Sequence, residues 1–101
     1  MSWTTRVHPE AGAEVEATAA WYEAHRPGLG LEFVAAIDHA LSLLADNPTQ
    51  FALWKRNLPW RRCVLTRFPY IAFYRVEGRV VRIMAVAHAR RRPGYWISRA
   101  R

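Results

Sequence analysis

The spacing of apolar side chains predicts two helices in the first half of the chain. One apolar face recurs at helical spacing over residues 10–26, and its members are Ala11, Val15, Ala19 and Tyr22. A second face follows the same spacing over residues 29–46, and its members are Phe33, Ile37, Ala40, Leu41 and Leu44. A Pro-Gly pair at 27–28 separates the two stretches, and an Asn-Pro pair at 47–48 ends the second. Because the connection is so short, we expect the helices to form an antiparallel hairpin.

The pattern on either side of these helices is that of strands. Residues 3–8 alternate in polarity and predict a first strand. After a loop at 49–59, three runs rich in β-branched and aromatic residues predict three more strands, at residues 61–68, 70–76 and 79–87. Glu77-Gly78 forms a two-residue hairpin connection between the last two strands, and a short, partly helical tail follows. The order β-α-α-β-β-β predicts an α+β fold, with the helix hairpin packed on one face of a small, mainly antiparallel sheet.

Length and composition indicate one folded domain over residues 1–101. Its 51% hydrophobic content excludes a disordered chain. The single cysteine, Cys63, excludes an internal disulfide and is expected to be buried in a strand. His8, His25 and His39 are scattered, so we expect neither a metal site nor another cofactor. No secretory leader and no apolar run of membrane length is visible, and we therefore expect a cytoplasmic protein.

Charge is distributed very unevenly between the two halves of the chain. Residues 1–50 carry two basic and seven acidic side chains, a net charge of −5. Residues 51–101 carry thirteen basic side chains and one acid, Glu77, a net charge of +12. A folded half with so much positive charge predicts a surface that binds an anionic partner, either nucleic acid or an acidic protein segment. The alternative is a basic face that only contacts solvent.

A series of short motifs runs through nearly the whole chain in a fixed order. The motifs are Trp21-Tyr22-Glu23, Arg26-Pro27-Gly28-Leu29-Gly30, Phe33, Asn47-Pro48, Arg61-Arg62, Arg67-Phe68-Pro69-Tyr70, Ala85-Val86-Ala87-His88 and Arg91-x-Pro93-x-Tyr95-Trp96. Each motif alone is weak evidence. Together, over residues 10–97, they resemble toxins of the RelE/ParE superfamily from bacterial type II toxin–antitoxin systems, and in particular the ParE-like branch.

This resemblance implies a growth-inhibiting toxin that is silenced by a cognate antitoxin in a hetero-oligomeric complex. The antitoxin of such a system typically wraps an acidic, amphipathic segment around the toxin, which suits the basic half of this chain. ParE-like members bind and poison DNA gyrase, whereas RelE-like members cleave messenger RNA on the ribosome. A third possibility is a basic nucleic-acid-binding module without toxicity.

The choice between gyrase and the ribosome depends on a few positions. Ribonuclease chemistry needs an acid, a base and cations beside the phosphate, and the candidate set is Arg62, His88, Arg90 and Tyr95. Val64 and Ile71 stand where ribonuclease members of the superfamily often carry cations. The pattern therefore favours a ParE-like inhibitor with no catalytic site of its own, and His88 is then a structural, hydrogen-bonding residue.

Several side chains are candidates for binding the target or the antitoxin. They are Trp21, Arg61, Arg62, Arg67, Arg90, Arg91, Arg92 and Trp96. For Trp21 the alternative is packing against the sheet. The run at 90–92 is either a solvated charge cluster or a set of cations that stack on the aromatic residues just after it.

Adjacent residues on a strand face opposite sides, and this applies to Arg61 and Arg62. We expect one of them to reach the basic surface. The other is expected to pair with a helix carboxylate such as Glu14 or Glu23, and the sequence leaves open which arginine does which.

Overall fold

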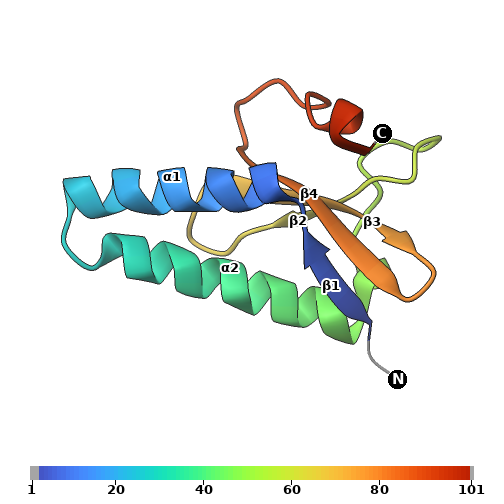
Figure 1. Ribbon diagram of the computed structural model, residues 1–101, viewed down its shortest axis with the longest axis horizontal. Helices are drawn as coiled ribbons and strands as arrows, with labels where there is room; N and C mark the ends of the chain where they lie inside the picture. The colour runs from blue at the N-terminus through green and yellow to red at the C-terminus, as the bar shows by residue number, and fades with distance from the viewer. Residues whose placement is uncertain (1–2, 101) are drawn as a thin grey trace.

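Both predicted helices form at the expected places in the structure, a computed structural model that describes residues 3–100. Helix α1 spans Pro9–His25 and helix α2 spans Leu29–Asp46. They lie side by side as an antiparallel hairpin whose turn projects beyond the strands (Figure 1). Neither of them is both long enough and apolar enough to cross a bilayer.

The Glu23 carboxylate binds backbone amides of the hairpin turn. Both oxygens of Glu23 accept hydrogen bonds from the Gly28 amide, at 3.0 and 2.9 Å, and one also accepts from the Gly30 amide. Gly28 has a φ of 89°, a value that glycine adopts without the steric cost of a side chain. A Cβ at Gly30 would lie 2.6 Å from the carbonyl oxygen of Ala19, so glycine allows the helices to approach closely here.

The four strands form one mixed sheet in the order β1-β4-β3-β2. Strand β1 (Thr4–Val7) pairs in parallel with β4 (Val80–His88). Strand β3 (Tyr70–Glu77) pairs antiparallel with both β4 and β2 (Arg61–Val64). The predicted mainly antiparallel α+β fold is thus confirmed.

Strand β2 is shorter than the predicted run of residues 61–68. The chain leaves the strand after Val64 and turns, and Arg67 takes a left-handed backbone conformation with φ 73°. Leu65 and Phe68 are buried although they lie outside the strand. These two residues are apolar because they reach the core on the helix side from a turn, and not because they belong to a strand.

The sheet has a core on each face. On the helix side, apolar residues of both helices pack on strand residues, and Cys63 is buried there as predicted. On the other face, the C-terminal segment with η2 (Ile97–Ala100) folds back over the strands (Figure 1). A short helix η1 (Pro48–Gln50) begins the connection that leads from α2 toward β2.

Candidate binding groove beside the first helix

A hollow of about 550 Å³ lies between α1 and the neighbouring ends of β3 and β4. We call it the α1 groove, and its lining residues are Ala17, Thr18, Trp21, Tyr22, Pro69, Tyr70 and His88. A second hollow of about 230 Å³ shares Ala17, Thr18, Tyr70 and His88 and adds the side chains of Glu14 and Arg91. The two together form a path that is aromatic at one end and charged at the other.

Trp21 gives the α1 groove its exposed aromatic wall. This residue is 57% exposed. The centroid of its ring lies 3.9 Å from that of His25 and 5.2 Å from that of Tyr22. Packing of Trp21 on the sheet, the alternative considered from the sequence, is wrong. A large aromatic surface held open in this way is typical of a binding site.

The floor of the groove is continuous with the core. The Tyr22 ring packs against three other aromatic rings. Its centroid lies 5.1 Å from that of Phe68, 5.5 Å from that of Phe33 and 6.2 Å from that of Tyr70. Burial, together with the nearby Tyr70, raises the pKa of Tyr22. The floor is therefore an apolar, firmly packed surface.

His88 lies where three hollows meet. It lines the α1 groove, its charged continuation, and a smaller hollow of about 130 Å³ on the other side. Its Nδ1 accepts a hydrogen bond of 3.0 Å from the Arg90 amide, and its ring meets the edge of Tyr70 at 5.2 Å. Within residues 3–100, no three His, Cys, Asp or Glu side chains are grouped as metal ligands would be.

The structure brings together two of the four residues of the ribonuclease set. Arg62 and His88 both line the smaller hollow, and Arg91 lines it as well. Arg90 and Tyr95 are not among the residues that line it. Two members of the set therefore face the same small hollow.

Tyr95 is engaged elsewhere. Its hydroxyl donates a hydrogen bond of 2.7 Å to Glu14, and the Arg91 guanidinium lies 3.5 Å from its ring centre. Burial, followed by the hydrogen bond to Glu14, raises the pKa of Tyr95 far above its ordinary value. A proton on this hydroxyl is therefore strongly retained.

Glu14 is a centre of hydrogen bonds and ion pairs that the sequence did not reveal as one. Its carboxylate accepts hydrogen bonds from the Val86 amide, from Tyr95 and from two nitrogens of Arg99, and Arg91 lies 3.6 Å away. Burial raises its pKa, but the hydrogen bonds from Arg99, Tyr95 and the Val86 amide outweigh burial and hold the pKa below its ordinary value. Glu14 thereby fastens the C-terminal segment to α1 and β4.

The expected pairing of Arg61 or Arg62 with a helix carboxylate is wrong. Arg61 donates to the carbonyl oxygen of Phe51 at 2.7 Å, and its more distant acceptor is the carbonyl oxygen of Thr49. Arg62 is exposed, so it is the one that reaches the surface. Both candidate carboxylates bind other groups: Glu14 accepts hydrogen bonds from Arg99 of the C-terminal segment, and Glu23 accepts them from the Gly28 amide in the hairpin turn.

Trp96 is wrong as a binding residue. It has no exposed surface, and its ring stacks on Phe73 at 3.9 Å with an interplanar angle of 19°. The ring centroids of Trp54 and Trp60 lie 5.0 and 6.4 Å from that of Trp96. Trp96, although it follows a basic run, thus belongs to the core on the face of the sheet opposite the helices, which we call the second core.

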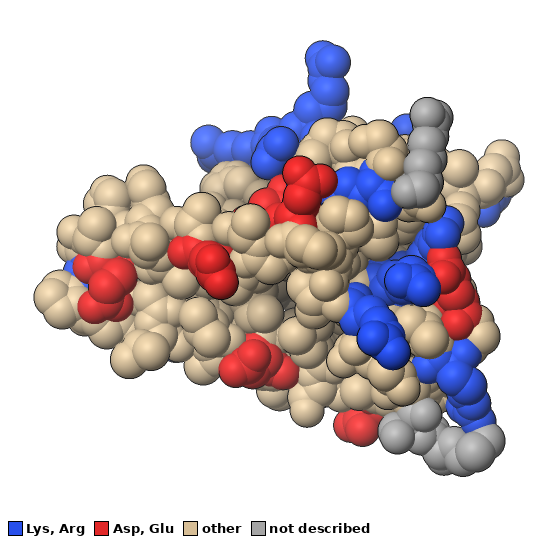
Figure 2. All heavy atoms as spheres, viewed as in Figure 1, with Lys and Arg blue, Asp and Glu red and all other residues tan. Residues whose placement is uncertain are grey.

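The remaining arginine candidates lie on the surface. Arg90, Arg91 and Arg92 are all exposed, and Arg91 stacks on an aromatic ring, which was one of the two alternatives for this run. Arg67 is exposed and pairs with Glu32 of α2 at 2.7 Å. In Figure 2, acidic side chains are spread along the helices, whereas basic ones gather over the strands and the C-terminal segment.

The family described as the ParE toxin of the type II toxin–antitoxin system, parDE, matches residues 5–93. No curated protein sequence matches the chain.

Two solved structures share the fold. One, from the chromosomal ParDE toxin–antitoxin system of P. aeruginosa, has a TM-score of 0.74 at 24% identity and covers 85% of this chain and 95% of its own. The other, from the RelBE2 toxin–antitoxin complex of Mycobacterium tuberculosis, has a TM-score of 0.63 at 17% identity and covers 87% and 99%. The family match extends over most of the chain, and the chain belongs to the ParE toxin family of type II toxin–antitoxin systems.

Proposed function

We propose that this toxin inhibits growth by binding DNA gyrase and that it does not cleave RNA. The observation that carries the proposal is the position of Tyr95, whose hydroxyl is bound to Glu14 and which does not line the hollow shared by Arg62 and His88. In addition, Val64 and Ile71 place apolar groups where phosphate-binding cations would be needed.

A ribosome-dependent ribonuclease is the second candidate. It is favoured by one observation, the presence of Arg62, His88 and Arg91 around the same hollow of about 130 Å³. An imidazole beside two guanidinium groups is a workable arrangement for proton transfer next to a phosphate.

Substitution of His88 separates the two candidates. For a gyrase inhibitor we expect His88→Gln to keep the toxicity of the wild type, because glutamine retains a hydrogen-bond acceptor of similar size. For a ribonuclease, loss of the acid–base group lowers activity by about a hundredfold or more. The measurement is growth after induced expression, with His39→Gln on the exposed side of α2 as the matched control. Loss of toxicity in His88→Gln alone would contradict the gyrase proposal.

We also propose that the cognate antitoxin places an amphipathic segment in the α1 groove. Its apolar side would cover Trp21, and its acidic side chains would lie near Arg91 at the charged end of the path. This arrangement matches an apolar surface with an apolar face and a cation with acids.

The exposed indole is the expected centre of that interface. We expect Trp21→Ala to weaken antitoxin binding by about 2 kcal/mol, roughly thirtyfold in Kd. Titration calorimetry with the antitoxin encoded beside the toxin measures this. Leu31→Ala, at a residue of α2 that is 77% exposed and outside the groove, serves as the control. Equal affinities of the wild type and Trp21→Ala would place the antitoxin elsewhere.

A further inference from the structure

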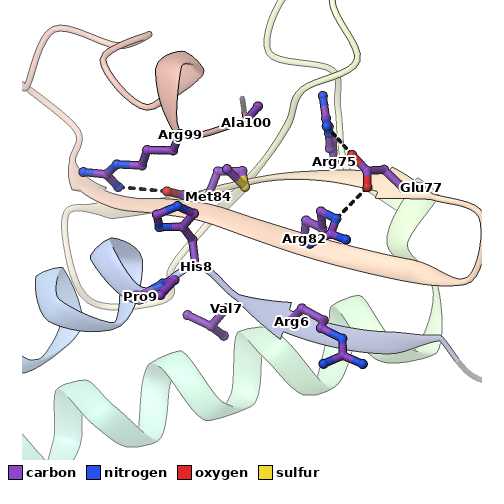
Figure 3. A pocket seen from close by; sticks show the side chains of 10 residues that line it. All are labelled: Arg6, Val7, His8, Pro9, Arg75, Glu77, Arg82, Met84, Arg99 and Ala100. Carbon is purple, nitrogen blue, oxygen red and sulfur yellow. Dashed lines mark hydrogen bonds and ion pairs between the residues drawn. The ribbon is translucent and has the colours of Figure 1, made fainter.

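A further cavity, of about 410 Å³, lies where β1 leads into α1 (Figure 3). Its polar lining is almost entirely cationic and consists of Arg6, His8, Arg75, Glu77, Arg82 and Arg99. This cavity shares no lining residue with the α1 groove or with the hollow that Arg62 and His88 line. It is therefore separate from both the proposed antitoxin site and the candidate ribonuclease site.

Two arginines of this cavity already surround an oxyanion. Arg82 donates its Nε proton to Glu77 at 2.5 Å, and Arg75 forms an ion pair with the other oxygen of the same carboxylate. Figure 3 shows Glu77 between them, with His8 and Arg99 on the other side. The hydrogen bond from Arg82 and the charge of Arg75 hold the pKa of Glu77 below its ordinary value, although burial raises it.

The cavity has more positive charge than its own acid balances. Four arginines and one carboxylate line the cavity, and of these arginines Arg99 is the one that pairs with acids outside it, Glu10 and Glu14. Arg6 is exposed and forms no ion pair with any residue from 3 to 100. The Nε atom of Arg75 is buried without a hydrogen-bond partner among these residues.

The start of α1 adds to the positive potential. Pro9, the first residue of α1, lines the cavity, so the positive end of the helix dipole points into this region. The His8 imidazole uses Nδ1 to accept the Glu10 amide proton. Its Nε2 is then the nitrogen that carries the proton in the neutral ring and can donate.

We infer that this cavity binds a phosphate group, which competes with Glu77 for Arg82 and Arg75. Planar guanidinium groups match the oxygens of a phosphate in pairs, and an excess of cations over carboxylates favours an anion that carries more than one charge. The volume accommodates a phosphate together with the group that bears it. Such a site goes beyond the proposed inhibition of gyrase, and the phosphate belongs either to a monoester terminus or to a nucleic-acid backbone.

The test is calorimetric titration of the full-length protein with inorganic phosphate, at an ionic strength held constant with chloride. We expect saturable binding that Arg82→Gln and, separately, Arg6→Gln each weaken by about tenfold, since each removes a charged hydrogen-bond donor. We expect Glu77→Gln to tighten binding, because it removes the competing carboxylate. Arg92→Gln makes the same charge change on an exposed arginine outside the cavity and is expected to bind as the wild type does.

Circular dichroism of each variant confirms that it is folded, and all four substitutions are at residues with solvent-accessible side chains. No saturable binding by the wild type would overturn the inference, and so would weaker binding by Glu77→Gln or an equal loss in Arg92→Gln. Binding of an acidic peptide in place of phosphate, with the same dependence on Arg82, would also overturn it.

A pair of short oligonucleotides, with and without a 5′-phosphate, identifies the source of the phosphate. Tighter binding of the phosphorylated strand supports a site for monoester termini. Equal binding of both strands, weakened alike by Arg82→Gln, supports a site for the phosphodiester backbone. Neither result depends on toxicity, so the site can be tested even if the gyrase proposal fails.

Discussion

Trp96→Ala is expected to destabilise the fold by about 4 kcal/mol, as large-to-small substitutions of buried tryptophan do. The side chain is completely buried, stacks on Phe73 and contacts two further tryptophans. Its removal leaves a cavity in the second core, where the C-terminal segment packs on the sheet. Such a loss is a large part of the 5–15 kcal/mol that stabilises a typical domain. Urea denaturation followed by far-ultraviolet circular dichroism measures it.

Trp21→Ala is the matched control for this loss. The same atoms are removed from a side chain that is 57% exposed, so we expect a change below about 1 kcal/mol. If the two alanine variants unfolded at the same urea concentration, Trp96 would not be the anchor of the second core.

Glu14→Gln is expected to cost about 2–3 kcal/mol, because it leaves the largely buried Arg99 with the exposed Glu10 as its one remaining charged partner among residues 3–100. The Arg99 side chain is 11% exposed and that of Glu14 15%, so solvent replaces little of the lost interaction. Glutamine preserves the size of the side chain and accepts fewer of the hydrogen bonds from Arg99, Tyr95 and the Val86 amide. The same denaturation experiment measures the loss, with Glu16→Gln at an exposed position of α1 as control.

The effect of Glu14 must also depend on pH in a defined direction. Its pKa in the folded state is below the ordinary value of 4.5, so its ionised form stabilises the fold. This contribution is complete above the unfolded pKa and is lost as the pH falls through the lower, folded pKa. The difference between the wild type and Glu14→Gln should therefore shrink as the pH falls below 4.5. A difference that stayed constant down to the acid transition would contradict the assignment.

The sequence predicted the fold well because local signals agreed with tertiary packing. Helical spacing, the break at 27–28 and the hairpin connection at 77–78 each determine structure over a few residues. Strand β2 was predicted too long because Leu65 and Phe68 are apolar for burial from a turn, which a period of two does not distinguish from a strand.

The contacts at the candidate sites were harder to predict because they join distant parts of the chain. Glu14 and Arg99 are separated by 85 positions, and nothing local indicates which of thirteen basic residues in the second half would pair with that carboxylate. Trp96 follows a run of arginines and was predicted on the surface, yet Phe73 in the middle of the sheet buries it. The surface position of residues 90–92 was predicted, since it depends only on the local charge. The exposure of Trp21 was one of two alternatives that the sequence left open.

Pulse labelling after induced expression in bacteria tests the proposed target most directly. Thymidine and methionine incorporation are followed separately over the first minutes. For a toxin that poisons gyrase, we expect DNA synthesis to stop early while protein synthesis continues. An early stop in protein synthesis, with DNA synthesis intact, would contradict gyrase as the target and would make Arg62 and His88 the residues of a ribonuclease site.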